Sequence, residues 1–344
     1  MSRRSRDGSV EFSDARKTLL CRPVNKMYKT FYRLSSNPFG ISPDPRFLYL
    51  MPHTREALAA LEFGISARRG FIVLTGEAGT GKTTLLRRTI EFFDPNLIVS
   101  SFVFNPRLDV LDFMEFILTD FGLTPTSHTK SGMLLQLNRW LIERFRAGQT
   151  CVIVIDEAQN LSMDMLEEIR LLTNLETSSD KLLQIVLSGQ PELADLLTSP
   201  QLRQLRQRIA LWCRTYSLTE EQTLDYVERR LVIAGALPEE QKDPETALFS
   251  REALIEVHRG SQGIPRLVNL ICEHSLIFGY VDQLRQIPAS IVRDVIQDLD
   301  LGAHHENPML DTKSGGPTLH PAPPSNATAS DDQPVIERES GKAR

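Results

Sequence analysis

The sequence is poor in cysteine, has no long hydrophobic run and carries little excess charge of either sign. Its four cysteines, Cys21, Cys151, Cys213 and Cys272, lie far apart without a C-x-x-C pair, which favours buried thiols over disulfides or a metal site. No apolar run approaches the roughly 18 residues that cross a bilayer, and no hydrophobic region follows the charged N-terminal residues. The net charge of −5 gives no general attraction to nucleic acid, although it is compatible with a local basic patch. We expect a cytoplasmic protein without a signal peptide.

A glycine-rich loop is the strongest signal that the sequence does contain. It fits the phosphate-binding pattern G-x-x-x-x-G-K-[ST] and follows residues 71–75, which are typical of a buried strand. In this pattern the glycines let backbone N–H groups surround phosphates, Lys82 brings a positive charge to the β/γ oxygens, and Thr83 offers a hydroxyl to Mg²⁺. A helix that begins near Lys82 adds the positive end of its dipole. The predicted triphosphate-binding residues are Gly76, Glu77, Ala78, Gly79, Thr80, Gly81, Lys82, Thr83 and Thr84.

A second apolar run, residues 151–155, ends in Asp156 and Glu157. Ligands of open α/β sheets collect at the carboxyl ends of the strands, where these acids are expected. Asp156 is predicted to hold Mg²⁺, mostly through water, and Glu157 to orient or deprotonate the attacking water. Because the sequence has no Asn-Lys-x-Asp element that reads guanine, we expect ATP with Mg²⁺ as the ligand and Lys82 and Glu157 as catalytic groups.

Five polar residues further along the chain are weaker candidates. Ser188 and Gln190 follow a strand-like run, where either could sense the γ-phosphate, or where Gln190 could be a solvated turn residue. Arg206 and Arg208 precede the last strand-like run, a place from which a guanidinium can stabilise the transition state at a neighbouring subunit's γ-phosphate. The alternative is that Arg206 and Arg208 are ordinary surface residues. Arg203, which lies in the same run, is the weakest candidate for this role.

The alternation of apolar runs predicts an α/β fold with a five-stranded parallel sheet, followed by a small all-helical lid domain. The expected strands are 71–75, 97–104, 151–155, 182–188 and 211–217. The expected helices of the sheet region include 84–93, 109–121, 133–145 and 163–175, and those of the lid are 219–234, 250–259, 264–278 and 288–299. Thr219 and Ser250 are expected N-caps.

Domain boundaries follow from composition. We expect a basic flexible extension at 1–26, an α/β nucleotide domain at 27–217, a helical lid at 218–300 and a disordered tail at 301–344. Within the lid, Gly263-Ile264-Pro265-Arg266 opens a helix, because proline suits a first helical turn. Arg266 is then expected to face back toward the nucleotide and to sense closure of the lid.

The dispersed motifs resemble those of AAA+ ATPases, and among these the general secretion pathway ATPases of the ExeA/GspA type. The resemblance runs from about residue 27 to 299 and rests on the phosphate loop, the strand-end acids, the 205–208 and 263–266 runs and several shorter motifs. The shorter motifs are Met27-Tyr-Lys-Thr-Phe-Tyr-Arg-Leu, Asn37-Pro-Phe, Pro43-Asp-Pro-Arg-Phe, Asp156-Glu-Ala-Gln-Asn-Leu and Ser188-Gly-Gln-Pro-Glu-Leu.

The resemblance implies a role for each matching position. It implies Asp156 and Glu157 as the Walker B acids, Gln190 or Ser188 as sensor 1, Arg208 or Arg206 as the arginine finger, and Arg266 as sensor 2. It also implies that residues 37–47 line the adenine side. Family members of type II secretion continue into a membrane helix and a peptidoglycan-binding domain, and we expect this chain to have neither. Met27 is the usual family start, so residues 1–26 are expected to be an extension or to result from a misassigned start.

Two functions of different classes follow from these observations. The first is an ATP-hydrolysing homo-oligomer, a ring or filament, that assembles or remodels an envelope secretion or export machine through a membrane-bound partner, at the periphery of the inner membrane. The second is a DNA-binding accessory ATPase of the transposition type, favoured by the basic N-terminal arm and by the arginine pairs 68–69, 87–88 and 229–230. A scaffold that only binds nucleotide is a third reading, opposed by the intact acids.

Overall fold

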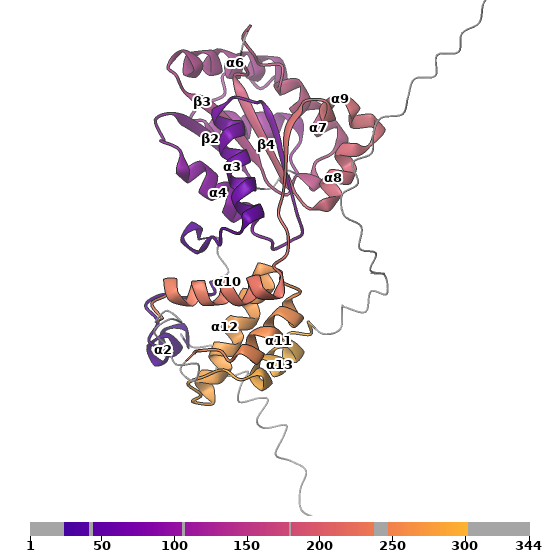
Figure 1. Ribbon diagram of the computed structural model, residues 1–344. Helices are drawn as coiled ribbons and strands as arrows, with labels where there is room; N and C mark the ends of the chain where they lie inside the picture. Colours follow the sequence, from indigo (N-terminus) through magenta and orange to yellow (C-terminus); the bar gives the residue numbers. More distant parts are fainter. Residues whose placement is uncertain (1–23, 41–43, 105–106, 179, 237–246, 302–344) are drawn as a thin grey trace, which may run out of the picture. The chain divides into compact units, whose positions relative to one another are not determined.

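The computed structural model describes residues 24–40, 44–104, 107–178, 180–236 and 247–301 (Figure 1). Cys21, most of the segment 1–26 and nearly all of the tail 301–344 lie outside these ranges. In the part of the chain that is described, no helix combines the length and hydropathy needed to cross a membrane.

Five parallel strands form one sheet in the order β2-β3-β4-β1-β5. Strands β1, β3 and β4 are buried along their whole length and are rich in Ile, Val and Leu, as expected of strands covered on both faces. The predicted parallel α/β fold is therefore confirmed. The strands are β1 (Phe71–Thr75), β2 (Ile98–Val103), β3 (Thr150–Ile155), β4 (Leu183–Gly189) and β5 (Ile209–Arg214).

The last strand differs most from its prediction, because it covers residues 209–214 rather than 211–217. The chain leaves the sheet after Thr215, whose N–H still donates to the Thr75 carbonyl at 2.8 Å. Residues 214–217, Arg-Thr-Tyr-Ser, are largely polar, and Leu218 after them is buried among the helices that follow.

Each face of the sheet has its own hydrophobic cluster, because side chains alternate along a strand. Ile72, Val154 and Val186 pack with residues of helices α3 (Pro52–Ser66) and α4 (Lys82–Phe92), whereas Val73, Ile153 and Ile185 pack with the helices that follow β2, β3 and β4. Cys151 and Cys213 are buried free thiols, as predicted. The helices and 3₁₀ turns of this region are η1 (Pro45–Phe47), α3 (Pro52–Ser66), α4 (Lys82–Phe92), α5 (Val110–Asp120), α6 (Lys130–Arg146), η2 (Ala158–Asn160), α7 (Met163–Leu172), α8 (Pro191–Thr198), η3 (Pro200–Leu202) and α9 (Arg203–Arg206).

Among the residues described after the last strand there are four helices, and a third cluster forms their core. Thr219 and Ser250 are N-caps, as predicted, and Thr219 forms a reciprocal capping box with Gln222. Cys272 is a buried free thiol in this core. The helices are α10 (Glu220–Ile233), α11 (Arg251–Ser261), α12 (Pro265–Val281) and α13 (Ala289–Asp298).

The segment that precedes the sheet region packs with these four helices. Helix α2 (Val24–Phe31) begins inside the expected flexible extension, and Tyr28, Tyr32 and Phe39 are buried in the helical cluster. The Tyr28 hydroxyl donates to Glu273 Oε1 at 2.9 Å, and the Tyr32 hydroxyl to the Leu284 carbonyl at 3.1 Å. Residues 28–39 thus share the core of the helical region, whereas the sequence analysis assigned them to the α/β domain.

Candidate nucleotide site

The glycine-rich loop connects the end of β1 to the first residue of α4, as the motif predicts. Gly79 and Gly81 have φ values of 81° and 95°, in the left-handed region that side chains other than glycine disfavour. Helix α4 begins at Lys82, so its free N–H groups and the positive end of its dipole lie at the loop. The loop and helix together form an anion-binding geometry.

Lys82 is only 5% exposed, and the loop backbone holds its ammonium group. Its Nζ donates to the carbonyls of Gly76 at 2.7 Å and Glu77 at 2.9 Å. Burial lowers the pKa of Lys82 from its ordinary value, while the charges of Glu157 and Asp156 oppose that shift. The ammonium is therefore poorly solvated and electrostatically suited to an anionic ligand.

Three donors fix the buried carboxylate of Asp156. They are the Thr83 hydroxyl at 2.5 Å, the Ser188 hydroxyl at 2.8 Å and the backbone N–H of Glu157 at 3.0 Å. The described residues contain no group of three His, Cys, Asp or Glu side chains that could hold a metal on its own. One hydroxyl beside one carboxylate fits Mg²⁺, which keeps several waters and takes its other ligands from phosphates. Ser188, predicted as a possible sensor, contacts this carboxylate.

Glu157 has a φ of 52°, an uncommon left-handed conformation, and precedes the 3₁₀ turn η2. Its Oε2 accepts hydrogen bonds from Gln159 Nε2 at 2.6 Å and from Gln190 Nε2 at 3.3 Å. The structure thus brings Gln190 to Glu157, and sensing of the γ-phosphate by Gln190 stays a prediction. Gln159 was not among the predicted site residues. It lies two residues after Glu157, on the turn η2 that directly follows this acid.

The three candidate finger arginines differ in their contacts. Arg208 is half-buried, and its Nη1 donates to Thr173 Oγ1 at 2.7 Å and Asn174 Oδ1 at 2.6 Å. Arg203 and Arg206 are exposed at the two ends of α9, and the described residues offer Arg206 no hydrogen bond or ion pair. None of the three lines the cavity at the phosphate loop. A role in the site of the same chain is therefore unsupported.

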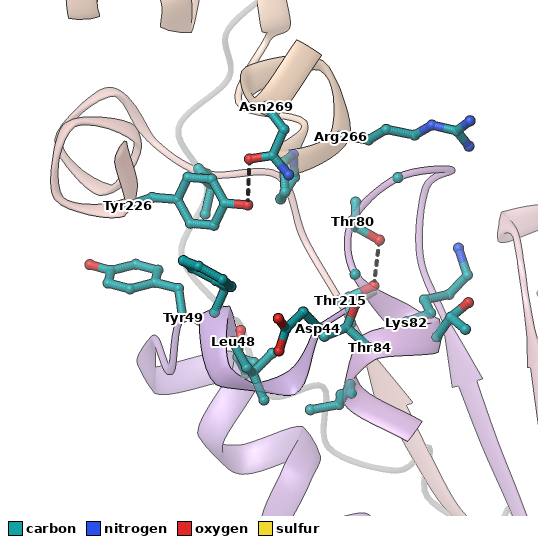
Figure 2. Close-up of a pocket in the computed structure, with 18 of the residues that line it drawn as sticks. Asp44, Leu48, Tyr49, Thr80, Lys82, Thr84, Thr215, Tyr226, Arg266 and Asn269 are labelled. Carbon is teal, nitrogen blue, oxygen red and sulfur yellow. Dashed lines mark hydrogen bonds between the residues drawn. The ribbon is translucent and has the colours of Figure 1, made fainter. Parts of the chain in front are cut away.

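Arg266 is the second residue of α12, and its backbone N–H donates to the Gly79 carbonyl at 3.2 Å. A Cβ placed on Gly79 would lie 2.8 Å from the Arg266 Cβ, so the glycine permits this close approach. Figure 2 shows the exposed Arg266 side chain extending over the phosphate loop from the helical side. The backbone of Arg266 thus contacts the phosphate loop, and sensing of a bound nucleotide by its side chain stays a prediction.

A cavity of about 330 Å³ opens between the phosphate loop and the helical residues. Residues 44–54 and the α10 and α12 helices complete its wall, and Thr80 and Thr215 are joined by a hydroxyl hydrogen bond of 2.7 Å (Figure 2). Gly40, Asp44 and Phe47 lie in the segment expected to line the adenine side. The lining residues that the sequence analysis did not assign to the site include Tyr49, Tyr226, Arg230 and Asn269.

Arg230 corrects the prediction that residues 229–230 form a basic cluster for DNA. It is 8% exposed, donates to the Pro38 carbonyl at 2.5 Å and to the Tyr226 hydroxyl at 2.9 Å, and lies 4.5 Å from the Phe47 ring centroid. Tyr226 in turn donates to Asn269 Oδ1 at 3.0 Å. Tyr226 and Arg230 are four residues apart, so the sequence predicts that they share one face of a helix. Their contacts with Pro38, Phe47 and Asn269 cannot be read from the neighbouring sequence.

Comparison with known proteins agrees with this geometry. A family model described as an AAA domain matches residues 65–197. General secretion pathway protein A of Aeromonas hydrophila is 42% identical over 255 residues, which cover 74% of this chain and 45% of that protein. The chain thus spans less than half the length of this relative.

Solved structures share the fold at low sequence identity. Cdc6p of Pyrobaculum aerophilum has a TM-score of 0.57 at 20% identity, covering 75% of this chain and 70% of its own. The ORC2 protein of Aeropyrum pernix, solved as ADPNP-ADP complexes, has a TM-score of 0.52 at 13% identity, covering 74% and 71%. Residues 65–197 thus match an AAA domain, and 255 residues of the chain are similar to general secretion pathway protein A.

Proposed function

We propose that this protein binds ATP with Mg²⁺ and hydrolyses it. The observation that carries the proposal is the convergence of Lys82, the Thr83–Asp156 pair and Glu157 at one cavity edge. Lys82 and the N-terminus of α4 bind the triphosphate, and Thr83 and Asp156 hold the metal ion, which neutralises charge on the phosphates. Glu157 orients the attacking water and accepts its proton.

A Mg²⁺-dependent release of phosphate from ATP tests this proposal. We expect Glu157→Gln to lower kcat about 100-fold or more, because general bases contribute about 10²- to 10⁴-fold, while nucleotide binding persists. Glu115→Gln is the matched control, since this acid is exposed on α5 and lies outside the cavity lining. Full activity of Glu157→Gln would exclude the proposed base.

Oligomerisation is the second part of the proposal. Among the described residues nothing hydrogen-bonds or ion-pairs with the Arg206 guanidinium, as a finger for a neighbouring subunit requires, whereas Arg208 is held by Thr173 and Asn174. We therefore propose Arg206 as the finger. Arg208, through its hydrogen bonds to Thr173 and Asn174, would hold the segment that carries Arg206 in place. Specific activity should rise with protein concentration, and Arg206→Ala mixed with Glu157→Gln should regain activity that neither has alone. Flat specific activity without recovery would indicate a monomeric ATPase.

The cellular role that we propose is assembly or remodelling of an envelope secretion or export machine through a membrane-bound partner. Its support is the sequence identity with general secretion pathway protein A. Affinity capture from detergent-solubilised cells of the source organism tests it, with Glu157→Gln holding ATP and Lys82→Ala as the control that cannot. We expect proteins of an envelope machine to be enriched with Glu157→Gln and not with Lys82→Ala. Equal recovery of these proteins with both variants would contradict the role.

The DNA-binding alternative receives less support from the arginine pairs. Arg230 is buried, and Arg68 donates to Thr150 Oγ1 and to the Gln149 carbonyl while stacking over Phe145. These guanidinium groups are used within the chain and are not available to phosphates. Filter binding to duplex DNA at two salt concentrations, with and without ATP, separates the two functions, because contacts with DNA phosphates weaken steeply with salt.

A further inference from the structure

The side chain of Gln159 has a fixed position beside Glu157. It is half-buried in η2, and both ends of its amide are hydrogen-bonded. Its Nε2 donates to Glu157 Oε2 at 2.6 Å, and its Oε1 accepts from the backbone N–H of Gln190 at 3.1 Å. If the amide were rotated by 180°, its oxygen would face the Glu157 carboxylate and its NH₂ group would face the Gln190 N–H. The two hydrogen bonds therefore determine the orientation of the amide.

The contact between Gln159 and the end of β4 depends on a glycine. A Cβ built on Gly189 would lie 2.7 Å from Gln159 Oε1, closer than these atoms can approach. The Gly189 carbonyl also accepts the backbone N–H of Gly76, at 3.2 Å, at the start of the phosphate loop. A continuous set of contacts therefore joins the loop to the carboxylate of Glu157 through Gln159.

The two oxygens of Glu157 consequently differ. Oε2 accepts amide hydrogens from Gln159 and Gln190, whereas Oε1 has no hydrogen bond to any residue that the structure describes. A carboxylate held at one oxygen leaves the other free, in a defined direction, for a water molecule.

We propose that Gln159 is a positioning residue for hydrolysis, which holds Oε2 so that Oε1 faces the attacking water. This inference rests on the proposed ATPase function. The water oxygen bonds to the γ-phosphorus, its proton passes to Oε1, and the bond from the γ-phosphorus to the bridging oxygen breaks, with its electrons leaving on ADP. Gln159 itself takes part in no bond change.

Gln159→Glu tests the proposal, because it keeps the shape of the side chain, removes the N–H donor and adds a charge that repels Glu157. We expect kcat to fall about 10- to 100-fold, since displacement of a catalytic group by about 1 Å costs up to about 100-fold. The KM for ATP and the Kd of a fluorescent ATP analogue should stay within about twofold. Asn160→Asp is the matched control: it makes the same chemical change one residue further, on an exposed side chain, and should leave kcat unchanged.

A double-mutant comparison separates positioning from a structural effect. With Glu157→Gln already in place, Gln159→Glu should not lower the residual rate further, because it acts only through Glu157. Gln159→Met removes the donor without adding charge and should lose about tenfold in kcat, which keeps the test valid if the acidic variant unfolds. Unchanged kcat in Gln159→Met, or equal losses in both backgrounds, would overturn the inference while leaving the ATPase proposal intact. A wild-type protein without ATPase activity would instead refute the proposed function.

Discussion

The two sides of the cavity are built by different means. The sheet side comes from two short stretches, residues 76–84 and 156–159, where backbone groups and charged side chains determine the geometry. The helical side comes from two separate segments, around residues 226 and 269, which meet the Phe47 ring of η1, so that aromatic rings, one buried guanidinium and one amide pack together. In the proposed function the charges on the sheet side bind the ligand, whereas Arg230 on the helical side makes contacts within the fold. Substitutions on the two sides should therefore fail in different ways.

Lys82→Ala should give the largest effect and lose function without losing stability. Removing a preorganised positive group costs about 100-fold or more in affinity or rate. Because Lys82 is buried and poorly solvated in the free protein, its removal should not lower the melting temperature. Fluorescent nucleotide titration and thermal melts measure the two quantities, with Lys130→Ala as the exposed control. A large loss of stability in Lys82→Ala would remove the distinction between the two sides.

Arg230→Ala should show the opposite pattern and lose stability first. It leaves the Pro38 carbonyl without its donor and the Tyr226 hydroxyl without one partner, and it removes packing against Phe47. Losses at buried charged hydrogen bonds amount to about 3 kcal/mol. Urea unfolding of Arg230→Ala and of its exposed neighbour variant Arg229→Ala measures this, and the latter should stay within about 0.5 kcal/mol of wild type. Equal stability of the two variants would show that the buried contacts contribute little.

Gly79→Ala sharpens the comparison, because Gly79 lies where the two sides meet. Alanine at φ 81° is strained, and its Cβ would lie 2.8 Å from the Arg266 Cβ. Strain of about 1 kcal/mol or more should weaken ATP binding about tenfold in isothermal titration calorimetry. Gly40→Ala provides the control, since Gly40 also lines the cavity but a Cβ there meets nothing within 4 Å. Similar affinities for both variants would argue against a tight loop–α12 contact.

Glu273 should give the smallest effect, which depends on pH. Burial raises the pKa of Glu273 above its ordinary value of 4.5, although Tyr28 and Asn37 donate to the carboxylate. An acid whose pKa is raised on folding stabilises the fold fully below pH 4.5, and this contribution is lost as the pH rises through the folded-state pKa. Glu273→Gln should therefore gain melting temperature relative to wild type between pH 4.5 and neutrality. A constant difference across that range would contradict the raised pKa.

The same contrast explains what the sequence could and could not predict. The parallel sheet, the phosphate loop and the paired acids follow from local patterns, because strand burial and loop geometry are determined within a few residues. The placement of residues 28–39 among the helices could not be predicted, since Tyr28 meets Glu273 and Asn37 meets the same carboxylate only after folding. Arg230 was assigned to the surface for the same reason: adjacent arginines look alike in sequence, and only tertiary contacts distinguish them.

The burial of Tyr28 and Tyr32 among helices α10–α13 has a consequence for how the chain is connected. The sheet region is an insertion within the helical region, because the chain leaves the helical core before α3 and returns to it after β5. Two covalent connections, rather than one, therefore join the regions. A single proteolytic cut in either connection cannot release a separate nucleotide-binding fragment, and torsion applied to one connection is resisted by the other.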